Sequence, residues 1–247
     1  MNYSLFCLTA REREETADVL TDCGKIRKFL IKILLLMAEE RATIRIYLLD
    51  EFRKLPRGGS RRDDCLRGDR MNKVYDVLII GGGVVGSAIA REMARNKLSI
   101  GVLEKNLDVC YETSGRNSGV VHGGFAYDPG TLKAACCVEG NIGFDQLAEE
   151  LDIPFSRCGK VLVGNTEEDM ATLKRTIEQG KVNGARDLRL IDKEELHRLV
   201  PAVVGEFAMF SPNSGIVDPF KYTIALAENA AQNGVEYFFD HEVTDLH

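Results

Sequence analysis

The sequence predicts an α/β fold: a doubly wound, mostly parallel sheet with an antiparallel β plus helix subdomain inserted into it. Two observations support this prediction. Apolar strand patterns alternate with amphipathic helical patterns from Val74 onward, and the first strand ends in a glycine-rich turn, Gly81–Gly86. Such alternation is typical of β-α-β units, whose parallel strands need a right-handed crossover connection.

The first β-α-β unit can be followed residue by residue. Residues 74–80 form an apolar run, residues 84–96 have helical spacing, and residues 99–103 form a second apolar run that ends in Glu104. Further on, Asp128 and Pro129 predict the start of a helix that runs to about residue 150. An Asp side chain caps free N–H groups, and Pro fixes φ where no N–H is needed.

The remaining elements predict an insertion. Short strands are expected at 160–163, 188–191 and 206–211, and helices at 167–181 and 192–199. Asp218 and Pro219 predict another capped helix to residue 233, and the strand at 235–239 then returns to the first sheet. The chain is thereby divided into a Rossmann-like domain, 71–155 and 212–247, which we expect to be incomplete at its C-terminal end, and an inserted substrate subdomain, 156–211.

Residues 1–70 differ in character from the rest. They hold 15 Lys and Arg against 12 Asp and Glu, whereas residues 71–247 hold 17 against 26. Met71 opens the strand pattern, so we predict that it is the first residue the fold needs and that residues 1–70 are upstream sequence read in frame. The alternative is a genuine helical extension, since apolar residues between 26 and 37 have helical spacing.

Composition limits the class of protein. The acidic balance of residues 71–247 argues against a nucleic-acid partner. The most apolar stretch, residues 29–37, is much shorter than the roughly 20 residues that span a bilayer, so no membrane span is expected. The seven cysteines form no CxxC pair and show no zinc spacing, which predicts no metal site and favours a reduced, cytoplasmic location.

The glycine turn predicts a dinucleotide site. Gly81 permits a tight turn, Gly83 lets the backbone approach a pyrophosphate, and Gly86 allows close packing of helix against strand. The following helix presents free N–H groups to the phosphates. Glu104 ends the next strand, where a carboxylate accepts ribose hydroxyls and disfavours the 2′-phosphate of NADP. The motif alone does not distinguish FAD from NAD.

The segment Thr113–Gly124 makes that distinction. Its run Ser-Gly-Arg-Asn-Ser-Gly-Val-Val-His, followed by Pro129-Gly130-Thr131-Leu132-Lys133, resembles the flavin loop of the FAD-dependent D-amino-acid-oxidase-like (DAO) superfamily. Within it, the pattern is most similar to the glycerol-3-phosphate dehydrogenase and L-2-hydroxyglutarate dehydrogenase branch. The resemblance runs from about Val74 to the end of the chain, includes Gly215–Pro219, and leaves out residues 1–70.

The resemblance implies an FAD-dependent enzyme that oxidises a 2-hydroxy acid or a glycerol-3-phosphate-like alcohol by hydride transfer to the flavin. Electrons would then pass to a quinone, oxygen or another acceptor. It also implies the cofactor contacts beyond the glycine turn and Glu104: Lys105, Ser114, Asn117, Ser118, Gly119 and the backbone of Val243, which reads the adenine edge.

His122 is the residue that the resemblance places nearest the flavin ring. Two roles stay open: a base that removes the hydroxyl proton, or a group that only positions the ring. Arg116 and Lys133 are candidates for binding the substrate's acid group, with solvated surface charge as the alternative.

Two further readings remain. The same fold oxidises amines and amino acids, which this part of the sequence does not exclude. The second alternative is that the chain is not an enzyme by itself. It would then be an inactive gene fragment, or one half that assembles with a separately encoded C-terminal half.

Overall fold

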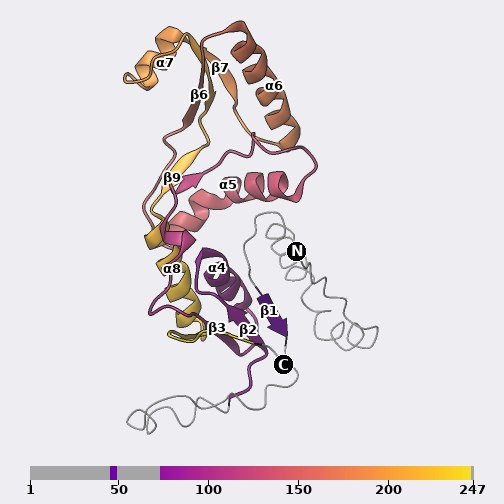
Figure 1. Ribbon diagram of the computed structural model, residues 1–247, viewed down its shortest axis with the longest axis vertical. Coiled ribbons are helices and arrows are strands. Elements are labelled where there is room, and N and C mark those ends of the chain that lie inside the picture. The colour runs from indigo at the N-terminus through magenta and orange to yellow at the C-terminus, as the bar shows by residue number, and fades with distance from the viewer. Residues whose placement is uncertain (1–44, 49–72, 246–247) are drawn as a thin grey trace. The chain divides into compact units, whose positions relative to one another are not determined.

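The computed structural model describes residues 73–245 and, as a backbone strand only, residues 45–48 (Figure 1). The first sheet has the order β1-β2-β3-β10, formed by Arg45–Leu48, Val77–Ile80, Ile100–Leu103 and Glu236–Phe238. β2 and β10 each pair in parallel with β3. The predicted parallel sheet and the return of the strand near residue 235 are therefore confirmed.

Two helices build the core beside this sheet. α4 (Val84–Met93) contacts β2 and β3, and α8 (Pro219–Gln232) packs along α4 (Figure 1). Strand residues Ile79 and Val102 are fully buried, as is Ile89 of α4. Burial of side chains of this size stabilises a fold by about 1.5–3 kcal/mol each. The core therefore fixes the ends of β2 and β3, from which the glycine turn and Glu104 project.

A second, small sheet connects to the long helix α5. β4 (Val120–Val121), β9 (Gly215–Val217) and β5 (Phe155–Ser156) pair antiparallel in that order. α5 spans Leu132–Glu150, and its N-cap is Thr131, whose Oγ1 accepts from the backbone N–H of Ala134. The predicted cap at Asp128 is wrong, because a turn through Gly130, at φ +80°, separates it from the helix.

The third sheet has the order β6-β8-β7, with Lys160–Gly164, Phe207–Ser211 and Arg189–Asp192 all antiparallel. α6 (Glu167–Asn183) packs against it through Leu173 and Ile177, and the short α7 (Lys193–Leu199) follows β7. The expected antiparallel β plus helix subdomain is confirmed. Its limits at residues 156 and 211 stay a prediction.

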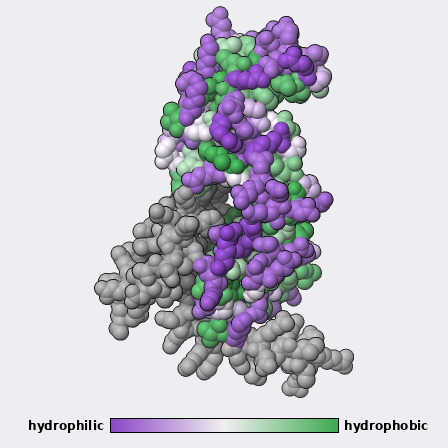
Figure 2. Space-filling view, turned by 180° about the vertical axis from the view of Figure 1, so that it is seen from behind, coloured by the Kyte–Doolittle hydropathy of each residue, from purple (hydrophilic) through white to green (hydrophobic). Residues whose placement is uncertain are grey.

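The surface is mixed in character. On the face shown in Figure 2, hydrophilic side chains cover much of the described surface, and apolar side chains lie between them in smaller patches. Within residues 73–245, no helix combines the length and apolar character needed to cross a membrane.

Strand β1 lies upstream of Met71 and pairs antiparallel with β2, with Arg45 opposite Ile80 and Leu48 opposite Val77. In the common doubly wound order 3-2-1-4, β10, β3 and β2 correspond to strands 3, 2 and 1, so β1 occupies the place of strand 4. This pairing is at odds with the expectation that the fold needs nothing before Met71. The helical spacing at 26–37 lies outside the described residues.

Removing residues 1–70 is therefore expected to destabilise the sheet. Each lost backbone hydrogen bond is worth about 0.5–1.5 kcal/mol, and each kcal/mol lowers the thermal midpoint by roughly 2–4 °C at this chain length. Hydrogen exchange should also quicken at the β2 amides that face β1. Equal midpoints and equal exchange in the full chain and in one starting at Met71 would show that the fold does begin at Met71.

Candidate functional site

The glycine turn lies between the end of β2 and the start of α4. A Cβ atom built on Gly86 would lie 2.0 Å from the carbonyl oxygen of Gly81, and one on Gly83 would lie 2.9 Å from Ser114 Oγ. The N-cap residue Gly83 offers α4 no side-chain bond, while the N–H of Val84 donates to Ser114 Oγ at 3.0 Å. The turn thus brings the backbone of Gly81, the start of α4 and the loop that contains Ser114 into close contact.

Glu104 closes the other side of this turn. Its side chain is buried, with 7% exposed, and Oε2 accepts from the N–H of Gly82 at 2.7 Å. Oε1 accepts from the backbone N–H of Asn106 at 2.9 Å and from its Nδ2 at 2.7 Å. A carboxylate has about four lone-pair positions, so Oε2 keeps one for a hydroxyl donor. Glu104 therefore holds the glycine turn and retains capacity for a ribose.

Three other predicted cofactor residues are exposed or half-buried. Lys105 is exposed and forms an ion pair with Glu112 at 3.3 Å, which lowers the pKa of Glu112 through hydrogen bonding and charge. Ser118 is exposed in the loop, and Val243 is half-buried in the segment after β10. The sequence prediction for these three residues stays a prediction, since their contacts do not by themselves indicate a ligand.

The loop at 113–119 is closed by its own side chains. It opens with the 3-10 turn η3, Thr113–Gly115. Asn117 Nδ2 donates to the carbonyls of Thr113 and Ser114, at 3.2 and 2.8 Å, and its Oδ1 accepts from the N–H of Gly119 at 2.8 Å. Gly119 has φ +63°, and its carbonyl accepts from Val217 at 2.9 Å. Asn117 therefore shapes the loop.

A cavity of about 320 Å³ is lined by the loop at 113–119 and by the start of α4, whereas Glu104 and the three motif glycines do not line it. Ligand sites typically have volumes of roughly 300–1,000 Å³, so this one is large enough for part of a cofactor or a small substrate. Val84, Ser114 and His122 line it, and α5 and α8 supply further lining residues. The site residues lining it that the sequence predicted are Ser114, Asn117, Gly119 and His122.

His122 follows β4 directly and lines the cavity, whose walls cover one part of the side chain while the rest is exposed. Its pKa is lowered, first by partial burial and second by the positive charge of Lys160. The imidazole is therefore neutral at neutral pH, the state in which it accepts a proton.

The two predicted anion-binding side chains are engaged elsewhere. Arg116 donates to the carbonyl of Tyr111, and Lys133 Nζ lies 4.8 Å from the centre of the Tyr127 ring. Sequence reasoning missed Lys160, the first residue of β6. It pairs with Ser211, whose Oγ lies against Gly123, the residue after His122. No motif marks Lys160, because only strand pairing brings it to this place.

Fold and site together define a dinucleotide-binding domain, with a glycine turn and an acidic residue at the ends of adjacent parallel strands. Residues 76–247 match the family described as FAD dependent oxidoreductase (DAO), and the chain belongs to this family. The expected cofactor, FAD, is confirmed at the level of the family.

Curated relatives support the same placement. The chain is 39% identical over 175 residues to a glycerol 3-phosphate dehydrogenase of Caloramator mitchellensis, covering 70% of this chain and 36% of the relative. It is 42% identical over 174 residues to the mitochondrial L-2-hydroxyglutarate dehydrogenase of Nematostella vectensis, covering 70% of this chain and 38% of the relative. The chain thus spans well under half the length of these relatives.

Solved structures agree on the fold. An FAD-bound L-alpha-glycerophosphate oxidase from Mycoplasma pneumoniae matches with a TM-score of 0.65 and 30% identity, covering 70% of this chain and 46% of that one. A glycine oxidase from Geobacillus kaustophilus matches with a TM-score of 0.64 and 26% identity, covering 70% and 48%.

Proposed function

We propose that this chain forms the FAD-binding part of an enzyme that oxidises an alcohol carbon beside an acid group, as in a 2-hydroxy acid or glycerol 3-phosphate. The observation that carries the proposal is one cavity that is lined both by Val84, at the start of α4, and by His122. The names of the relatives, a glycerol 3-phosphate dehydrogenase and an L-2-hydroxyglutarate dehydrogenase, support the substrate class.

The residues of the site fit FAD. The lone-pair position left on Glu104 suits a ribose hydroxyl, and the close approach at Gly86 brings the start of α4 to the pyrophosphate position. Ser114, Asn117 and Gly119 line the same cavity as His122. When bound, FAD supplies the two-electron acceptor, and the protein supplies orientation and electrostatics.

In this proposal His122 acts as the base. Its lowered pKa keeps the imidazole neutral, so it is able to accept the hydroxyl proton of the substrate, and FAD bound in this site would supply the hydride acceptor. Lys160 binds the acid group. No carboxylate of residues 73–245 forms an ion pair with its ammonium group, which packs instead 5.8 Å from the centre of the Phe125 ring. A half-buried cation that no described carboxylate engages is available to an incoming anion.

Amine oxidation is the second candidate, and the structural likeness to glycine oxidase favours it. The two candidates differ in the substrate that reduces the flavin. We expect L-2-hydroxyglutarate or glycerol 3-phosphate to bleach bound FAD under anaerobic conditions faster than glycine does. Faster bleaching by glycine would replace the first candidate with the second.

Glu104→Ala should weaken FAD binding by the full chain. Loss of a hydrogen bond to a charged group costs about 1.5–3 kcal/mol, or roughly 10- to 150-fold in Kd. The mutation also removes the acceptor of the Gly82 backbone N–H. Fluorescence titration measures this loss. Glu178→Ala is the matched control, since that carboxylate is exposed on α6, where it pairs with Lys181. The proposal is refuted if wild type binds NADP more tightly than FAD.

A further inference from the structure

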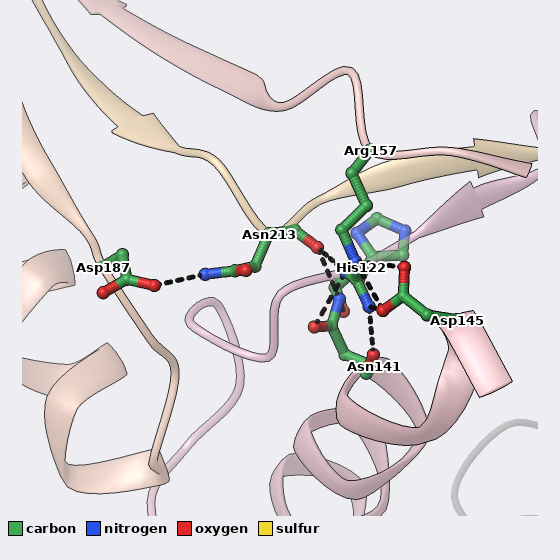
Figure 3. A network of polar contacts seen from close by, with 6 residues as sticks. All are labelled: His122, Asn141, Asp145, Arg157, Asp187 and Asn213. Carbon is green, nitrogen blue, oxygen red and sulfur yellow. Dashed lines mark hydrogen bonds and ion pairs between the residues drawn. The ribbon is translucent and has the colours of Figure 1, made fainter.

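A network of polar contacts lies behind His122, on the side of α5 (Figure 3). β4 ends at Val121, so no described strand pairing includes His122. Its carbonyl accepts instead from two side chains of α5, Asn141 Nδ2 at 3.0 Å and Cys137 Sγ at 3.5 Å. The next residues are glycines, and Gly124 has φ +81°. The backbone at this point is therefore held by side chains.

Asn141 is itself fixed in one orientation. Its side chain is buried, with 5% exposed, and Nδ2 donates a second hydrogen bond to the carbonyl of Asn213 at 2.8 Å. Its Oδ1 accepts from Arg157 Nη1 at 3.3 Å. A reversed amide would point its oxygen at two carbonyl oxygens and lose both bonds, so only one orientation satisfies the group.

Arg157, from the segment after β5, locks this arrangement. Its Nε donates to both carboxylate oxygens of Asp145, at 3.0 and 2.9 Å, which lowers the pKa of Asp145. Its Nη2 donates to the carbonyl of Asn141 at 2.6 Å, and its Nη1 to the carbonyl of Asn213. The planar guanidinium thereby joins α5 to the turn before β9, and Figure 3 shows these bonds converging beside His122.

We propose that Asn141 and Arg157 are positioning residues that set the place of the His122 imidazole at the cavity. Arg157 does not line the cavity, and it acts on His122 only through Asn141. Asn141 is the buried member of this network, and its satisfied hydrogen bonds hold the carbonyl of His122 in one place, while Arg157 and the exposed Asp145 hold Asn141 from the solvent side. The role of the imidazole itself rests on the function proposed above, whereas its placement by these residues does not.

The test is imidazole NMR on the full 247-residue chain without FAD. The signal of His122 is assigned by its loss in His122→Gln, and exposed His197 serves as an internal reference. Arg157→Lys keeps the positive charge but removes the planar guanidinium with its several N–H donors. Asn141→Leu removes both hydrogen bonds that Nδ2 donates, without adding charge. In each variant we expect the His122 signals to shift and broaden and its pKa to rise toward the ordinary value, because the ring leaves the surroundings that lower it.

The control is Arg189→Lys, which removes a comparable fork to Glu195, with bonds of 2.8 and 2.7 Å, on β7. It should leave the His122 signals unchanged. The proposal is overturned if the His122 signals of Arg157→Lys are the same as those of wild type, or if Arg189→Lys shifts the His122 signals by as much as Arg157→Lys does. Should Asn141→Leu not fold, Arg157→Lys alone decides.

In the FAD-loaded chain, Arg157→Lys should slow flavin reduction by up to about 100-fold, the cost of a misplacement near 1 Å, with an FAD Kd within about threefold of wild type. An unchanged rate in Arg157→Lys would also overturn the positioning role. Failure of wild type to bind FAD would refute the proposed function and leave the NMR result intact.

Discussion

Gly86→Ala is expected to lower the thermal midpoint of the chain and to abolish measurable FAD binding. The new methyl group would lie 2.0 Å from the carbonyl oxygen of Gly81, a backbone atom that moves only with the turn itself. Overpacking of this kind costs about 1–3 kcal/mol, or roughly 2–4 °C for each kcal/mol. The shift also moves the first turn of α4 away from the place where its N–H groups meet the pyrophosphate.

Gly143→Ala is the matched control. It adds the same methyl group inside α5, where no described atom outside the helix's own backbone lies within 4 Å, so alanine should stabilise the helix by about 0.5–1 kcal/mol. Opposite changes in midpoint, measured by calorimetry, with FAD binding lost only at Gly86, are the expected result. Normal FAD affinity in Gly86→Ala would mean that the close approach of α4 to β2 is not needed for the site.

The sequence predicted the nucleotide-binding core well because that information is local. The apolar runs, the glycine spacing and Glu104 all lie within about 30 residues, and each has one physical meaning in a β-α-β unit. The structure places Glu104 against Gly82, 2.7 Å apart, as adjacent parallel strands require. The N-cap at Asp218 was predictable for the same reason, and its side chain accepts from Phe220 and Lys221.

The features that the sequence did not reveal depend on distant contacts. Lys160 reaches the neighbourhood of His122 through its pairing with Ser211, some 50 residues away. Asn141 and Arg157 have no motif, and their role follows only when α5 and two other segments meet. The cap at Thr131 was missed because Asp128 and Pro129 carry the same signal one turn earlier, and the left-handed Gly130 then decides where the helix starts.

His122→Gln is expected to slow anaerobic reduction of bound FAD by about 10²- to 10⁴-fold, the usual contribution of a general base. Glutamine keeps a similar size and polarity but accepts no proton near neutral pH. In wild type the rate should fall as the pH drops through the pKa of His122, which lies below the ordinary value of about 6.5. In the variant this dependence should disappear.

Lys160→Met separates the two roles assigned to the site. Removing its charge should raise the pKa of His122, so the acidic fall in rate moves to higher pH, although burial, the larger cause, still holds the pKa below its ordinary value. The variant should also need a higher concentration of an acidic substrate, because the cation that binds the acid group is gone. For the preceding variant, His122→Gln, a rate within roughly tenfold of wild type with the same pH profile would contradict the role of His122 as a base. It would leave His122 as a group that only orients the flavin or the substrate.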